Sequence, residues 1–76
     1  MLKKRSFSIA GHRTSVALEP EFWTALEAEA RKYHLSLAAL IGRIDAARAG
    51  RNLASSLRVH VLTNGSGARQ DATRVQ

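Results

Sequence analysis

The segment from Arg13 to Leu18 constrains this chain most, because its side chains alternate between two faces. Thr14, Val16 and Leu18 form an apolar or β-branched face, and the opposite face is small and polar with a cation at its start. This pattern predicts a short β-strand over residues 12–18, the only one that we expect in the chain. A lone strand leaves backbone N–H and C=O groups unpaired. Its simplest partner is the same strand of a second copy, paired antiparallel across a two-fold axis.

The length and composition favour the same homodimer. A chain of 76 residues forms one small domain, which buries a limited share of its surface. It has no cysteine, which excludes disulfides and cysteine-based metal sites. Association with a second copy is the reinforcement that remains.

Basic residues are concentrated at the start of the chain, whose formal net charge is +6. We expect residues 1–11 to form a basic arm, whose first cations are Lys3, Lys4 and Arg5. Phe7 and Ile9 alternate with serines, so the strand could begin within the arm and bend at Gly11. A basic arm beside a basic strand indicates a polyanionic partner, nucleic acid before membrane. The alternative, with equal weight, is a solvated and disordered terminus.

Three helices are expected after the strand, over about residues 20–34, 36–49 and 52–63. Pro20 suits the first position of a helix, and Ser36 and Asn52 are preferred N-cap residues. Residues 64–76 have no periodicity, so we expect a disordered tail there. The sequence has no signal-peptide pattern and no apolar run long enough to span a bilayer, so a cytoplasmic, nucleoid-associated protein is expected.

The order of one strand, a helix, a short turn and a helix resembles the ribbon-helix-helix DNA-binding domains, and most closely a group of small bacterial proteins of that family. Four stretches carry the resemblance: Ala10-Gly11-His12-Arg13-Thr14-Ser15-Val16, Leu18-Glu19-Pro20-Glu21-Phe22-Trp23, Leu35-Ser36-Leu37-Ala38-Ala39-Leu40-Ile41 and Asn52-Leu53-Ala54-Ser55-Ser56-Leu57-Arg58-Val59. In the turn between the first two helices, His34 stands where the family often has glycine. The resemblance implies a mostly α, intertwined homodimer with an intermolecular two-stranded ribbon, to which this chain adds a third helix.

The resemblance also implies which residues would contact DNA. In this family the ribbon enters the major groove, so its outward side chains Arg13, Ser15 and Ala17 would contact bases. Phosphate contacts would come from the arm and from the start of the second helix: Lys3, Lys4, Arg5, Ser36, Leu37 and Ala38. We expect the dimer core to contain Thr14, Val16, Leu18, Phe22, Trp23, Leu26, Leu40, Ile41 and Ile44.

The predicted function is therefore sequence-specific binding of double-stranded DNA by a homodimer, or by several dimers together. It would act as a transcriptional regulator or an antitoxin-type repressor. The alternative is a dimeric adaptor of the same fold that binds a protein. The third helix supports it, because its apolar stripe could cover the dimer core, join dimers or dock a partner.

Metal binding and catalysis are not expected. No two of His12, His34 and His60 have the i,i+3 or i,i+4 spacing of a helical metal site. The sequence has no nucleophile elbow and no phosphate-binding loop, and so small a core leaves little room for a concave catalytic site. We expect no cofactor and no enzymatic activity.

Overall fold

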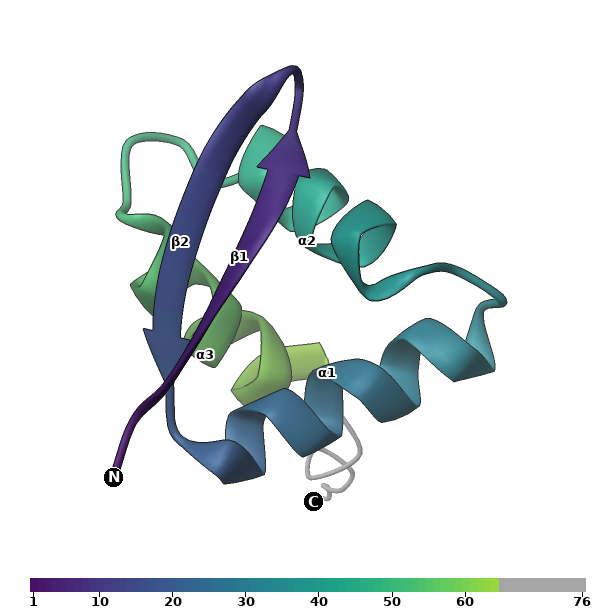
Figure 1. Ribbon diagram of the computed structural model, residues 1–76. Helices are drawn as coiled ribbons and strands as arrows, with labels where there is room; N and C mark the ends of the chain where they lie inside the picture. The colour runs from purple at the N-terminus through teal and green to yellow at the C-terminus, as the bar shows by residue number, and fades with distance from the viewer. Residues whose placement is uncertain (65–76) are drawn as a thin grey trace.

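A hairpin of two strands covers a layer of three helices (Figure 1). The computed structural model describes residues 1–64, in the order β1 (Lys3–Ile9), β2 (His12–Leu18), α1 (Pro20–Lys32), α2 (Leu37–Ala46) and α3 (Leu53–Asn64). Helix α2 packs against β1 and α3 packs against β2, while α1 contacts both of these helices. Of the predicted tail, residues 65–76 lie outside the described residues.

The prediction of a single strand is wrong, because β1 of the same chain pairs antiparallel with β2. The register places Ile9 opposite His12 and Lys3 opposite Leu18. A two-residue turn joins the strands, with φ of 53° at Ala10 and 81° at Gly11. Positive φ at both turn positions is the type I′ geometry, whose twist matches that of the flanking strands. The segment expected to be an arm therefore contains a strand, and Gly11 belongs to a tight turn.

This pairing removes the reason for expecting an intermolecular ribbon. The backbone groups of β2 that face β1 have their partners within the chain, so no second copy is needed to satisfy them. The predicted dimer core is largely the core of one chain. Its members Val16, Leu18, Trp23, Leu26, Leu40, Ile41 and Ile44 are buried together with Ile9, Ala30, Leu53 and Leu57. Thr14 and Phe22 are partly buried.

Side chains and backbone turns set the helix ends. The N–H of Ala39 donates to Ser36 Oγ at 3.0 Å, and the N–H of Ser55 donates to Asn52 Oδ1 at 2.8 Å, so both predicted caps are present. Helix α2 ends at Ala46, earlier than residue 49. The N–H groups of Ala47 and Arg48 donate to Ile44 O and Asp45 O, three residues back, and the chain then turns through positive φ at Ala49 and Gly50.

Helix α1 ends in a Schellman motif at the position where the family often has glycine. The N–H of Leu35 donates to Ala30 O at 2.8 Å, and the N–H of His34 donates to Arg31 O at 3.1 Å. His34 is in the left-handed region, with φ of 58°. This conformation explains why the helix stops at Lys32, two residues before the predicted end.

Candidate nucleic-acid interface

The outward face of the hairpin carries polar and basic side chains from both strands. The register places Lys4 opposite Ala17, Ser6 opposite Ser15 and Ser8 opposite Arg13. Of the residues that alternate with them, Ile9, Val16 and Leu18 are buried against the helices, and Phe7 and Thr14 are partly buried. We call the six outward residues the outer face: Lys4, Ser6, Ser8, Arg13, Ser15 and Ala17.

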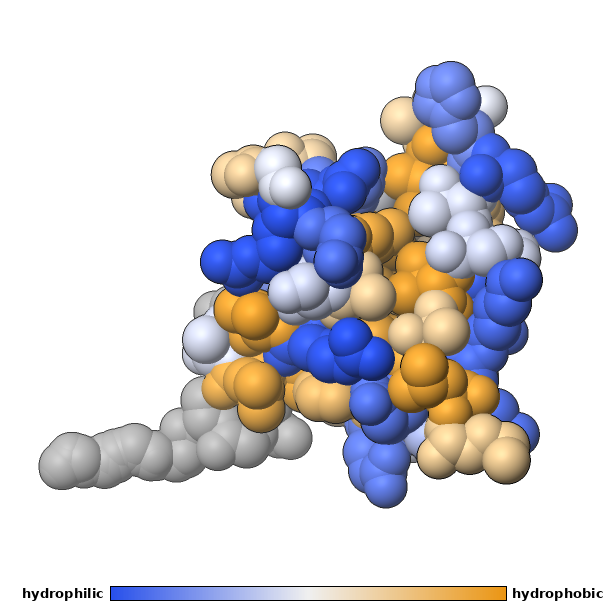
Figure 2. Space-filling model, turned by 90° about the vertical axis from the view of Figure 1, so that its left-hand side faces the viewer, coloured by the Kyte–Doolittle hydropathy of each residue, from blue (hydrophilic) through white to orange (hydrophobic). Residues whose placement is uncertain are grey.

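The outer face has two cations, three hydroxyl groups, one methyl group and no acid. Ala17 is half-buried and the other five residues are exposed. Ser6 Oγ and Ser15 Oγ lie 2.8 Å apart, which joins the strands at the centre of the face. Figure 2 shows the hairpin at the right, with hydrophilic side chains along its outward edge and hydrophobic ones between it and the helices. Such a surface can donate hydrogen bonds and attract anions.

The cations expected to contact phosphate differ in their surroundings. Arg5 Nη1 lies 2.7 Å from Glu27 Oε2, and its guanidinium lies 5.0 Å from the centre of the Trp23 ring. Trp23 Nε1 also donates to Lys3 O at 2.8 Å. Arg5 is therefore directed towards α1 and holds β1 against it, whereas Lys4 belongs to the outer face.

The predicted phosphate contacts at the start of α2 lie apart from the outer face. Ser36 Oγ serves as the N-cap, and Leu37 packs partly against the core. In Figure 1 this helix start follows the end of α1 at the right, away from the hairpin. The structure thus brings Arg13, Ser15 and Ala17 together with Lys4, but not with Ser36, Leu37 and Ala38.

An ion pair connects the start of α1 to α3. Arg58 Nε donates to Glu19 Oε1 at 3.0 Å, and the Arg58 guanidinium lies 5.9 Å from the centre of the Phe22 ring. The pKa of Glu19 is below its ordinary value of 4.5, because its carboxylate accepts a hydrogen bond from its own backbone N–H and another from Arg58. This pair supports the fold beneath the hairpin.

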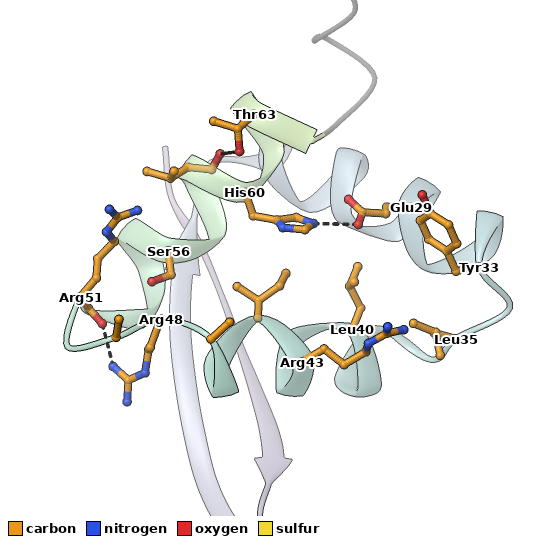
Figure 3. Close-up of a pocket in the computed structure, with 14 residues that line it drawn as sticks. Glu29, Tyr33, Leu35, Leu40, Arg43, Arg48, Arg51, Ser56, His60 and Thr63 are labelled. Atoms are coloured by element: carbon orange, nitrogen blue, oxygen red, sulfur yellow. Dashed lines mark hydrogen bonds and ion pairs between the residues drawn. The ribbon is translucent and has the colours of Figure 1, made fainter.

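A concave region lies between the three helices, away from the outer face (Figure 3). Its volume is about 600 Å³, and Leu40 and Ile44 contribute to its apolar wall. His60 Nε2 and Glu29 Oε2 lie 2.7 Å apart across it. Glu29 Oε1 and Ser56 Oγ are buried without a hydrogen-bond partner among the described residues. Polar and charged residues form much of its lining, among them Arg43, Arg48 and Arg51, but the carboxylate of Glu29 lies there too. The outer face carries no acid, so we take it as the candidate site for a polyanion.

The histidines do not assemble a metal site within the part of the chain that the structure describes. No group of three or more His, Cys, Asp or Glu side chains there could hold a metal ion. Among the same residues, no helix combines the length and the apolar character needed to cross a membrane.

The residues that sequence reasoning missed are Ser6 and Ser8. Both lie on β1 and reach the outer face only because β1 pairs with β2. The signal was present in the alternation of serines with Phe7 and Ile9, followed by a glycine-containing turn of two residues. Lys4 was expected to contact phosphate from a free arm, and the hairpin places it beside the base-contacting candidates instead.

The comparisons agree with this architecture. No curated protein and no solved structure matches the chain. Residues 2–64 match the family described as the ribbon-helix-helix domain. Members of that family typically bind DNA, usually as dimers, and are not known as enzymes. Because the match includes both strands and all three helices of the described residues, this chain belongs to the ribbon-helix-helix domain family.

Proposed function

We propose that this protein binds double-stranded DNA sequence-specifically by placing the β1–β2 hairpin in the major groove. The observation that carries the proposal is the outer face, a two-stranded surface with two cations, three hydroxyl groups and no acid. The major groove accepts a two-stranded ribbon, and its base edges present hydrogen-bond acceptors and donors. The family assignment supports the same partner.

The chemistry of the outer face suggests a role for each side chain. Arg13 can donate two hydrogen bonds to one guanine, Ser15 can bond to several bases, and Ala17 can contact a thymine methyl group. Lys4 can contact a phosphate or a guanine. Arg5 is engaged with Glu27, so we assign it to the support of β1.

The protein would act by occupying its DNA site, as a transcriptional regulator or as the DNA-binding half of a toxin–antitoxin pair. The family usually works as dimers, and two copies of this chain would each contribute a hairpin. A dimer of this kind joins through a surface other than the β1–β2 pairing, or it exchanges β1 between copies.

The structure weakens the alternative of a protein-binding adaptor. The apolar stripe on α3 that supported it packs within its own chain, where Leu53 and Leu57 are buried and Val61 is partly buried. An electrophoretic mobility-shift titration with random duplex at low salt separates the two functions. DNA binding that added salt abolishes supports our proposal, and no binding supports an adaptor.

A substitution at Arg13 tests the base-reading role. Arg13→Ala should weaken binding to a selected site by about 1–3 kcal/mol, and binding to random duplex by much less, if the arginine is bidentate to guanine. Arg43→Ala is the matched control. Arg43 is also an exposed arginine, but it lies on α2 beside the concave region between the helices and not on the outer face. Equal losses on selected and random DNA would contradict the role.

Lys4 is tested by the salt dependence of binding. The logarithm of the binding constant falls linearly with the logarithm of the salt concentration. Lys4→Ala should make this slope less steep by about 0.9 if Lys4 contacts one phosphate. We prefer this substitution to removal of residues 1–5, since that deletion would also remove part of β1. An unchanged slope would contradict the phosphate contact.

A further inference from the structure

We infer that the hairpin imitates, within one chain, the two-fold ribbon that two copies would otherwise build, and that each chain therefore reads an asymmetric DNA sequence. The inference rests on the proposed function. It concerns the kind of site that the outer face selects.

The two strands repeat one pattern, and the repeat matches the geometry of the hairpin. The segments Lys4–Ile9 and Arg13–Leu18 both read as a basic residue, any residue, serine, an apolar residue, a small residue and an apolar residue. In the register, Ser6 pairs with Ser15 at the centre of the outer face. A two-fold axis through this pair, perpendicular to the sheet, would exchange the two segments residue by residue.

This axis is approximate, because the exchanged side chains differ. It relates Lys4 to Arg13 and Ser8 to Ala17, and only the central serines are identical. A ribbon made from two copies of β2 would instead present the same side chains at both ends. The outer face is thus similar in shape at its two ends and different in chemistry.

The difference between Lys4 and Arg13 has a consequence for the DNA site. Arginine presents a planar fork that suits the O6 and N7 atoms of guanine, whereas lysine is a flexible point charge. The two residues are four positions apart along the ribbon, which is about 13 Å at roughly 3.3 Å per residue. That separation corresponds to about four base pairs at roughly 3.4 Å each. We therefore expect a strong guanine preference at one end of the site and a weaker preference about four base pairs away.

Selection of binding sites from randomised duplex, with the full chain, tests the inference. The expected half-site, the part of the motif that one hairpin contacts, lacks two-fold symmetry, and Arg13→Ala should relax it at one position only, with a loss of roughly 5- to 150-fold in preference there. Two-fold symmetry within one half-site, with Arg13→Ala relaxing two positions about four base pairs apart equally, would overturn the inference and leave the proposed function intact. Absence of any sequence preference would overturn sequence-specific binding, and the inference with it.

A gain-of-symmetry variant gives a second, independent readout. Lys4→Arg places an arginine at both ends of the outer face, so the selected half-site should gain a guanine preference at the weaker end. Lys3→Arg is the matched control, because alternation places residue 3 on the opposite side of β1 from Lys4. If Lys4→Arg selects the same motif as the unaltered chain, the claim that both ends of the outer face contact bases is contradicted.

Discussion

At the scale of single residues, the end of α1 depends on the backbone of His34. This residue is exposed and has φ of 58°, a conformation in which the Cβ of an L-residue crowds the neighbouring carbonyl. Glycine avoids that contact, although it loses more backbone entropy on folding. His34→Gly should therefore raise the free energy of unfolding by about 0.5–1 kcal/mol. Urea denaturation measures this change, and His34→Ala, which keeps a Cβ, should give no such gain.

The Glu19–Arg58 pair predicts a dependence of stability on acid. The pKa of Glu19 is lower in the folded chain, so the unfolded chain binds the proton first as the pH falls. The stabilisation by this carboxylate is fully present above pH 4.5 and is lost as the pH falls through the lowered folded value. The melting temperature, measured by thermal denaturation between pH 6 and pH 2.5, roughly the range over which carboxylates titrate, should fall less steeply for Glu19→Gln than for the unaltered chain. A fall in melting temperature that Glu19→Gln leaves unchanged would contradict this role.

At the scale of secondary-structure elements, α3 is part of the core. Leu57 is fully buried, whereas Leu62 on the same helix is 66% exposed. Leu57→Ala should cost about 2–5 kcal/mol of stability, because it removes a large side chain from a filled site. Leu62→Ala should stay within about 0.5 kcal/mol. Chemical denaturation of both variants measures the contrast, and similar small losses would mean that α3 is an accessory element.

The helices were easier to predict from the sequence than the pairing of the two strands. The three helices were predictable, because Pro20, Ser36 and Asn52 act on the backbone within a few residues and the apolar spacing is regular. The turn at His34 was harder, since histidine is not the usual residue for a left-handed helix end. The strand β1 was missed as a partner for β2 because Ala10-Gly11 lacks the Asn-Gly or Asp-Gly signature of a type I′ turn.

The candidate site was predicted only in part, because some of its residues depend on pairing between the two strands. The outward direction of Arg13, Ser15 and Ala17 follows from alternation within β2 alone. The contributions of Ser6 and Ser8 require the register between two strands, which alternation within one strand does not specify. The ion pair of Arg5 with Glu27 joins segments that are far apart in the sequence, so only the folded chain reveals it.

At the scale of the whole molecule, the decisive feature is that the ribbon closes within one chain. Ser6 Oγ and Ser15 Oγ lie 2.8 Å apart, so cysteines at both positions should form a disulfide. The chain has no cysteine of its own, so the variant Ser6→Cys/Ser15→Cys has no competing thiol. Its oxidised form should migrate as a monomer on a non-reducing gel. It should also gain about 2–3 kcal/mol of stability, the value typical of closing a loop of about ten residues.

The single variant Ser15→Cys distinguishes this arrangement from a ribbon shared by two copies. In a shared ribbon of two β2 strands, residue 15 lies near the two-fold axis, so Ser15→Cys alone should cross-link two chains. In the closed hairpin its neighbour is Ser6 of the same chain, and the thiol should stay reduced under mild oxidation. Covalent dimers from Ser15→Cys alone, or from the double variant at micromolar protein, would contradict the intramolecular ribbon. Retention of DNA binding by the oxidised double variant would show that the closed hairpin is itself the binding form, because the disulfide prevents β1 from leaving β2.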